Sequence, residues 1–375
     1  MVKEQKNSEM TVESASAVTI SFADLIRADH DVSHAISEAY GPDGLGVIVI
    51  SDVPDWEQLT QATIPLAHKL VNLGTECLKS LEHEPSLYNS GWSFGKEKLG
   101  DKPDFKKGSF YFNPLCDDPR PDIRENYPWA LPENRWPREQ LPDFETMCKK
   151  LGSRMHQVIV ALAKRIDEMK LGTPIASELE TSMKAKGRML YYFPLSEEEL
   201  VDAAKNPDGW IGWHNDSGFL TGLTPDLYFN HSTGEIIPNP EPDTAGLWVA
   251  DRAGVLRKVT IPPNSMAIQC GECLQVVTGG KLVATPHCVR PPLHHPGVSR
   301  ACMPLFVDST PEFKLECPNN DVAAVFQNTV KQRVPPLADR WTQGQTFADF
   351  LGTSFKAYYT WNKERVGSNP PVRDA

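Results

Sequence analysis

The sequence HNDSGFLT, residues 214–221, begins with a histidine and an aspartate two positions apart. On a β-strand, side chains at positions i and i+2 point to the same face, so His214 and Asp216 can bind one ion while Asn215 points away. Gly218 allows the backbone to turn tightly beside that ion. A His-x-Asp pair is also common by chance, and a hydrogen-bonded pair at the surface is the alternative.

A third ligand is expected from a strand further along the chain. His287 lies in the segment 284–290, ATPHCVR, whose alternation suits a strand. His294 and His295 are the alternatives, but their loop is rich in proline and glycine, which hold a ligand less firmly. Two imidazoles and one carboxylate occupy one face of an octahedral ion and suit Fe(II), because the other positions stay open. We therefore predict that His287 completes an iron site.

Arg300 follows in a segment whose other residues are largely apolar. A guanidinium buried in a strand needs an anionic partner, because an unpaired buried charge is prohibitive and arginine binds carboxylates through parallel hydrogen bonds. That partner is either a structural Asp or Glu, or the carboxylate of a small-molecule ligand.

Short β-prone segments follow one another after Gly187. The predicted strands are 189–193, 210–213, 218–223, 246–250, 256–261, 265–269, 281–284, 287–290 and 300–307. Strands at this density indicate a sandwich or barrel, and the natural one is a jelly roll, also called a double-stranded β-helix. The expected fold class is α+β and mainly β, with N-terminal and flanking helices.

Helical periodicity lies on both sides of these strands. The predicted helices are 23–40, 56–81, 143–170, 321–334 and 346–360, and a further strand is predicted over 44–50. His156 in the third helix is expected to pack rather than to bind a metal. We divide the chain into a flexible tail (1–17), an N-terminal mixed α/β region (18–180), the jelly-roll domain (181–320) and C-terminal helices with a tail (321–375).

Two proline-rich segments, 103–142 and 224–244, interrupt the pattern. The first contains eight prolines, and proline disfavours long helices and central strands because it lacks a backbone donor. Both segments are predicted to be loops. Each either covers the site as a lid or connects and wraps the scaffold.

Composition and charge restrict the class of partner. A formal net charge of −11, without a block of Lys or Arg, argues against nucleic acid. No apolar run approaches the roughly 20 residues that cross a bilayer, and the polar start MVKEQKNSEM is unlike a secretion signal. Eight cysteines without a dense spacing are typical of reduced thiols, and the Cys270/Cys273 pair has no second pair to complete a zinc site. We expect a cytoplasmic monomer that binds a small molecule.

Six segments carry a further pattern, in order along the chain. They are 214–221 (HNDSGFLT), 246–249 (GLWV), 261–265 (IPPNS), 269–272 (QCGE), 278–280 (TGG) and 285–287 (TPH). Together they resemble the 2-oxoglutarate- and Fe(II)-dependent dioxygenases of the isopenicillin N synthase-like superfamily. The resemblance implies that His214, Asp216 and His287 bind Fe(II). It also implies an enzyme that uses 2-oxoglutarate and O2 to oxidise, most commonly hydroxylate, a small organic molecule, releasing succinate and CO2.

The resemblance further implies that Arg300 holds the distal carboxylate of 2-oxoglutarate. The family usually has a serine two residues later, whereas Cys302 offers a weaker thiol donor. A family strand ending in Tyr-Pro supplies another carboxylate donor. Anchoring that strand on Pro194 points Tyr191 toward the pocket, whereas a slip of one residue points Tyr192 there, and both stay open.

Three aromatic residues, Trp213, Phe219 and Trp248, are candidates to line an apolar substrate pocket, although aromatics at strand positions are as often core. Hydroxylation, desaturation and ring closure all stay open. One alternative function is an iron-dependent oxidase without 2-oxoglutarate, which the missing serine favours. The other is a non-catalytic jelly-roll binding protein that keeps a vestigial site.

Overall fold

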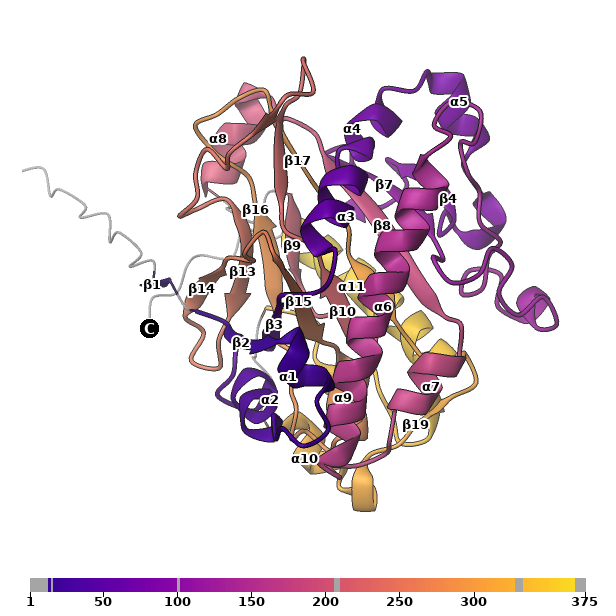
Figure 1. Ribbon diagram of the computed structural model, residues 1–375, viewed down its shortest axis with the longest axis vertical. Coiled ribbons are helices and arrows are strands. Elements are labelled where there is room, and N and C mark those ends of the chain that lie inside the picture. The colour runs from indigo at the N-terminus through magenta and orange to yellow at the C-terminus, as the bar shows by residue number, and fades with distance from the viewer. Residues whose placement is uncertain (1–12, 15, 100–101, 206–209, 328–332, 368–375) are drawn as a thin grey trace, which may run out of the picture.

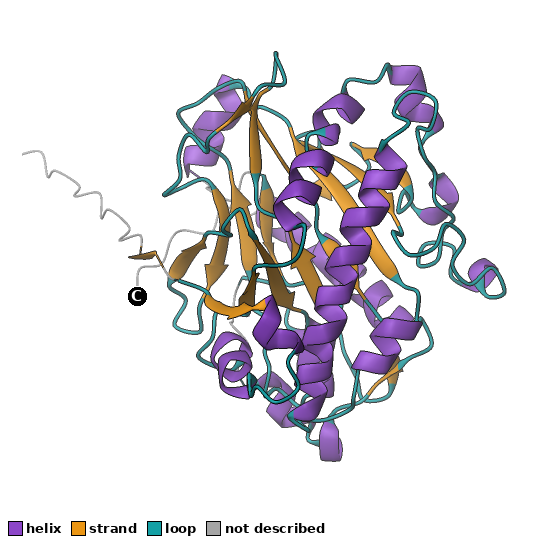
Figure 2. Cartoon of the chain, in the orientation of Figure 1, coloured by secondary structure: helices purple, strands orange, loops and turns teal. Residues whose placement is uncertain are grey.

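The computed structural model describes residues 13–14, 16–99, 102–205, 210–327 and 333–367. Two β-sheets form its centre, and helices cover the outside (Figures 1 and 2). The smaller sheet has the order β1 (Glu13–Ser14), β14 (Leu256–Val259), β13 (Gly246–Ala250), β16 (His287–Arg290) and β9 (Ile211–His214). Its β1 falls inside the segment that the sequence predicts to be a flexible tail. The jelly-roll, mainly β prediction is confirmed.

The larger sheet contains the strands that carry most of the core. Its order is β12 (Ile236–Ile237), β11 (Leu227–Asn230), β17 (Val298–Cys302), β8 (Ala185–Tyr192), β18 (Leu305–Val307), β10 (Leu220–Leu223), β15 (Ser265–Cys270), β3 (Val47–Ser51) and β2 (Val18–Ser21). In addition, β7 (Lys107–Phe112) pairs with β8, and β4 (Gly91–Phe94) pairs with β7. Neighbouring strands are antiparallel apart from β2–β3 here and β1–β14 in the smaller sheet. Pro304 separates β17 from β18, so the strand predicted over 300–307 is two strands.

Helix α6 (Phe144–Glu168) crosses the outer face of the larger sheet, as Figure 1 shows. Its apolar stripe, including Met155 and Ile159, is fully buried against β8, β10 and β18. Gly222 on β10 permits this contact, because a Cβ there would lie 2.3 to 3.3 Å from Met266, Ile159 and Met155. Burying each such side chain contributes about 1.5–3 kcal/mol. The helix is as predicted, and the His156 imidazole packs with its Nε2 3.2 Å from the carbonyl oxygen of Leu179.

The N-terminal helices are shorter than the sequence predicts. The segment 23–40 forms α1 (Phe22–Ile26) and α2 (Ser33–Tyr40), and 56–81 forms α3 (Trp56–Thr63), α4 (Leu66–Val71) and α5 (Thr75–Ser80). The breaks in the second segment fall at Pro65, which lacks a backbone donor, and next to Gly74, a poor helix former.

The proline-rich segment 103–142 contains β7, which pairs with both β4 and β8. The prediction that this segment has no central strand is therefore wrong. The prolines lie before and after β7, so its backbone N–H groups are all available to its neighbours.

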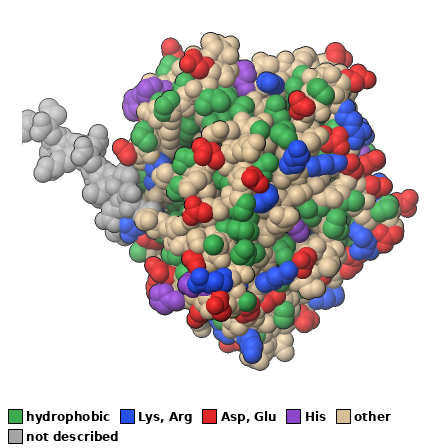
Figure 3. Space-filling view, viewed as in Figure 1, with side chains coloured by type: hydrophobic (Ala, Val, Ile, Leu, Met, Phe, Trp, Pro, Cys, Tyr) green, Lys and Arg blue, Asp and Glu red, His purple; other side chains and the backbone are tan. Residues whose placement is uncertain are grey.

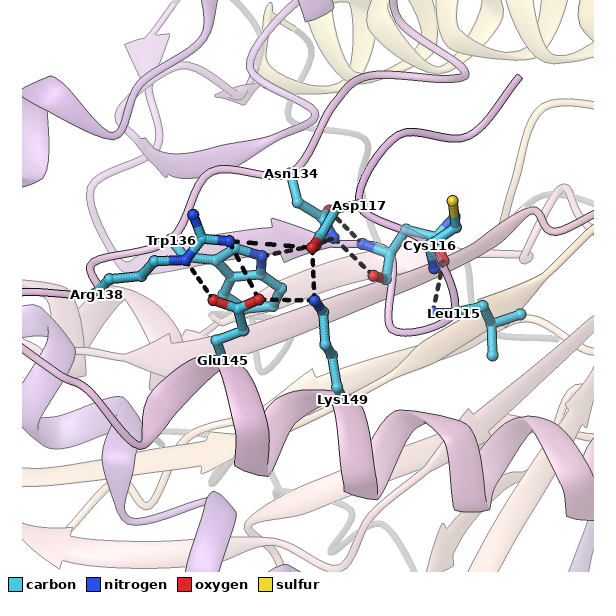
Figure 4. A network of polar contacts seen from close by, with 9 residues as sticks. Leu115, Cys116, Asp117, Asn134, Trp136, Arg138, Glu145 and Lys149 are labelled. Carbon is cyan, nitrogen blue, oxygen red and sulfur yellow. Dashed lines mark hydrogen bonds and ion pairs between the residues drawn. The ribbon is translucent and has the colours of Figure 1, made fainter. Parts of the chain in front are cut away.

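The rest of that segment is attached to α6. Figure 4 shows the Asp117 carboxylate accepting hydrogen bonds from Lys149 Nζ on α6 at 2.7 Å, Asn134 Nδ2 at 2.8 Å and Trp136 Nε1 at 2.9 Å. Lys149 also donates to Glu145, which pairs with Arg138. The segment thus wraps the scaffold.

After α6, the structure differs from the prediction at several further places. No strand forms over 281–284; helix α9 (Glu272–Val277) precedes it, and a turn with positive φ at Gly279 and Gly280 follows α9. The segment 224–244 is partly a hairpin of β11 and β12. The sequence also did not predict α7 (Ala176–Thr181) or α8 (Glu197–Lys205).

The last helices are α10 (Val322–Phe326) and α11 (Phe347–Gly367). Part of the helix predicted over 321–334 lies outside the described residues. Within the described part of the chain, no helix is both long and apolar enough to span a bilayer.

Candidate metal centre

The two candidate histidine ligands face each other across neighbouring strands. His214 is the last residue of β9 and His287 the first of β16, and the two are direct partners in the antiparallel pairing. Their rings therefore lie on one face of the sheet, with centroids 4.2 Å apart. Asp216 follows β9 two residues later and points to the same side.

The three side chains offer atoms to one point. One ligand atom of each lies within 4.8 Å of the others, and Asp216 Oδ1 is 4.0 Å from His214 Nε2 and 3.8 Å from His287 Nε2. Nδ1 of His214 lies 2.9 Å from the carbonyl oxygen of Gly212, and Nδ1 of His287 lies 3.2 Å from the carbonyl oxygen of Thr285. A carbonyl only accepts, so each Nδ1 carries the proton and each Nε2 presents a lone pair toward Asp216.

Electrostatics favour a cation at this point. The second carboxylate oxygen of Asp216, Oδ2, is buried and has no hydrogen-bond partner among the described residues, which is costly unless a cation or donor completes it. Burial and the neighbouring His287 lower the pKa of His214 to about 4, so the imidazole is neutral, as a ligand must be. Mixed nitrogen and carboxylate donors on one face fit Fe(II).

The loop that carries Asp216 is held by contacts the sequence did not reveal. Asn215 points away from the ligand side, and its Nδ2 donates to Glu272 Oε1 at 2.9 Å. The backbone N–H of Asn215 donates to the hydroxyl of Tyr358 on α11 at 2.8 Å, and the N–H of Glu272 donates to the Asp216 carbonyl at 2.8 Å. Glu272 and Tyr358 are far from the ligands in sequence, so no local pattern indicates them.

The ligands open into a cavity of about 340 Å³ between the two sheets. Apolar side chains such as Leu190, Leu223, Leu247 and Val259 form much of its wall. Residues of the segment 224–244 also line it, whereas none of 103–142 does.

The three aromatics predicted to line the pocket lie elsewhere. Trp213 precedes His214 on the same strand, so it points to the opposite face. Trp248 likewise points away from the cavity side of β13, beneath the Arg290 guanidinium at 4.1 Å. Phe219 is fully buried against Phe313 and Phe347. These predictions are wrong: strand alternation turns Trp213 and Trp248 away from the cavity, and Phe219, just before β10, packs into the core.

Arg300, Cys302 and Tyr192 line the same cavity as the three candidate ligands. Arg300 is 4% exposed and donates to the carboxylate of Asp226, and its guanidinium lies 4.7 Å from the centre of the Tyr192 ring. Burial raises the pKa of the Cys302 thiol to about 11, so it is a neutral neighbour. The sequence left the anionic partner of Arg300 open, and in this structure that partner is a structural aspartate, Asp226.

Tyr191 does not face the cavity. Its hydroxyl lies 2.9 Å from His231 Nδ1 and 2.6 Å from Ser299 Oγ on the opposite side of β8. Of the two tyrosines that the sequence left open, the strand therefore presents Tyr192 to Arg300 and removes Tyr191 from the cosubstrate candidates.

Comparison with known proteins shows which proteins this chain is similar to. No protein-family model matches the chain. A "2-oxoglutarate-Fe(II) type oxidoreductase ppzD" of Metarhizium rileyi is 28% identical over 212 residues, which are 53% of this chain and 52% of that protein. A "2-oxoglutarate-dependent ethylene/succinate-forming enzyme" of Ralstonia nicotianae is 27% identical over 70% of this chain and 74% of its own. In sequence the chain is thus similar to 2-oxoglutarate- and Fe(II)-dependent oxygenases.

The fold of this chain agrees with that of a solved structure. A Neurospora crassa protein, solved in complex with alpha-KG and 5-formyluracil, superposes with a TM-score of 0.62 at 16% identity, covering 93% of this chain and 96% of that one. The match to the Metarhizium protein spans about half of that protein's length.

Proposed function

We propose that this chain is an Fe(II)- and 2-oxoglutarate-dependent oxygenase. One O2 and one 2-oxoglutarate would oxidise a small organic molecule, most commonly to its hydroxylated product, with release of succinate and CO2. The observation that carries the proposal is the convergence of His214, Asp216 and His287 in a cavity that also contains Arg300. Bound Fe(II) and 2-oxoglutarate would together supply the activation of dioxygen.

The residues of the chain would bind and orient the reactants. The three ligands would hold the ion and leave its other positions open, and Arg300 would bind the distal carboxylate of 2-oxoglutarate. The apolar wall formed by Leu223, Leu247 and Val259 would exclude water from the reacting groups.

The cavity supports a small-molecule substrate. Its volume lies at the lower end of the usual range for small-molecule sites. The Neurospora neighbour is a complex with alpha-KG and 5-formyluracil. On the face seen in Figure 3, acidic and basic side chains are interspersed, and that face has no broad basic surface of the kind that binds nucleic acid.

An iron-dependent oxidase that does not use 2-oxoglutarate is the second candidate. The Arg300 guanidinium already pairs with the carboxylate of Asp226. Cys302 is found where the family usually has serine. Oxygen uptake without formation of succinate would favour this function.

Anaerobic titration with Fe(II) and then 2-oxoglutarate tests the proposal. We expect a weak visible charge-transfer band in the wild type and none in His214→Ala, followed by succinate after oxygen is admitted. A wild type that gives neither band nor succinate would disprove it. Incubation with a metabolite extract, followed by a search for products that gain one oxygen or lose two hydrogens, would then identify the substrate.

A further inference from the structure

Three polar side chains lie near Arg300 in the cavity wall. They are Asp226, Lys258 and Tyr228. Arg300 and Lys258 are 4% and 8% exposed, and Tyr228 is 2% exposed. Two cations therefore share one carboxylate in a buried environment.

The other charges nearby do not change this balance. Arg188 lines the same cavity but pairs with Glu97, and Asp216 faces the two histidines of the candidate metal centre. Asp243, which also acts on Lys258, is exposed to solvent. The group formed by Arg300, Lys258 and Asp226 thus has one positive charge in excess. A buried excess charge is unfavourable until an anion neutralises it.

Hydrogen-bond donors at this place are also unfilled. Nε and Nη1 of Arg300 and the hydroxyl of Tyr228 are buried and have no hydrogen-bond partner among the described residues. Leaving a buried donor unsatisfied is unfavourable, so oxygen atoms of a ligand would satisfy these donors favourably. Both the charge and the donors therefore indicate one additional carboxylate.

Gly246 leaves room for Asp226, Tyr228 and Lys258 to converge beside its backbone. Its φ is +117°, and a Cβ at this position would lie 3.2 Å from Asp226 Oδ2, 3.6 Å from the Tyr228 hydroxyl and 3.9 Å from Lys258 Nζ. Asp226 Oδ1 accepts from Arg300 Nη2. Lys258 Nζ donates to Thr260 Oγ1 at 3.3 Å, and the charge of Asp226 also acts on Lys258. Asp226 can release Arg300 without losing a positive neighbour.

We propose that Lys258 and Asp226 tune the carboxylate site of Arg300: Lys258 neutralises Asp226, and Arg300 with Tyr228 is thereby free to bind one carboxylate of the cosubstrate. The inference rests on the proposed use of 2-oxoglutarate. It makes Lys258 and Asp226 positioning residues, because they act on the ligand through Arg300. It also accounts for Cys302, since the site takes its extra donor from Tyr228 rather than from a serine hydroxyl.

The test is the binding of 2-oxoglutarate to the Mn(II)-loaded protein, measured by calorimetry without oxygen. Lys258→Met should weaken binding about tenfold or more, because Asp226 then repels the ligand. Asp226→Asn should bind about threefold to tenfold more tightly than wild type. The double variant should return to within about threefold of wild type. Lys314→Met, which removes an exposed lysine on β19 (Lys314–Leu315), is the matched control and should bind like wild type.

Each other outcome overturns the inference in a recognisable way. If the double variant stays as weak as Lys258→Met, Lys258 contacts the ligand directly. If Asp226→Asn weakens binding, Asp226 helps to bind the ligand; this variant decides the matter even if Lys258→Met does not fold. If the wild type binds Mn(II) but not 2-oxoglutarate, the proposed function and the inference both fail. If the wild type binds 2-oxoglutarate and all variants bind equally, only the inference fails.

Discussion

Arg340 and Glu272 form an ion pair that is closed off from solvent. Arg340 Nη1 lies 2.6 Å from Glu272 Oε2, and the two side chains are 0% and 1% exposed. Glu272 also accepts the hydrogen bond from Asn215, which lies between two of the proposed ligands. The ion pair therefore connects the C-terminal part of the chain to the metal centre.

Removing one member of this pair should strongly destabilise the fold. We expect Arg340→Met to lower the free energy of unfolding by about 3–5 kcal/mol, because Glu272 is left as a buried charge without a cationic partner. The double variant Arg340→Met/Glu272→Gln should recover part of that loss. Urea unfolding measures the free energy of unfolding of the single and the double variant. A loss below about 1 kcal/mol in the single variant would contradict the prediction.

Asn215→Ala should weaken metal binding more than it weakens the fold. The substitution removes the bond to Glu272 that fixes the loop between His214 and Asp216, and losing such a supporting contact typically costs about 10- to 100-fold in metal affinity. Competition with a chelator for Mn(II) gives the affinity. Asn72→Ala, at an exposed site outside the cavity, is the control and should leave it unchanged. Equal affinities in the two variants would show that Asn215 has no role in positioning.

His287, rather than the neighbouring histidines, should be required for metal binding. His287→Ala should reduce the affinity by at least about 100-fold, since it removes a ligand rather than a supporting contact. His294→Ala and His295→Ala should bind like wild type, because both lie in an exposed loop and the His294 ring faces Glu241. The three variants are compared by measuring their metal content after dialysis. Loss of metal in His294→Ala or His295→Ala would contradict the assignment.

Asp117→Asn should destabilise the protein in a pH-dependent manner. Burial raises the pKa of Asp117, but hydrogen bonds from Lys149, Asn134 and Trp136 outweigh it and lower this pKa from 3.8 to about 2. A depressed carboxyl pKa contributes stability that is present above pH 4 and lost as the pH falls toward 2. We expect the free energy of unfolding of the wild type to exceed that of the variant by about 1 kcal/mol at pH 7. Thermal unfolding between pH 7 and pH 2 should show this difference disappear, and a constant difference would contradict the role of the charge.

Local sequence patterns predicted the features that depend on short-range geometry. The apolar spacing of α6 requires a helix with one buried face. The His-x-Asp spacing places two side chains on one face of a strand, and His287 lies in a segment with strand alternation. The structure brings these three residues together because β9 and β16 pair at His214 and His287.

Which face of each strand is inside was decided only by the tertiary structure. A shift of one residue exchanges the two faces of a strand, so the sequence could not choose between Tyr191 and Tyr192 or recognise Trp213 and Trp248 as core. The pairing of β7 with two neighbours decided its central place despite the prolines around it. Asp226 meets Arg300 from 74 positions away, and Glu272 meets Arg340 from 68. Such contacts depend on how distant strands and helices pack, and packing is a property of the whole chain rather than of any segment.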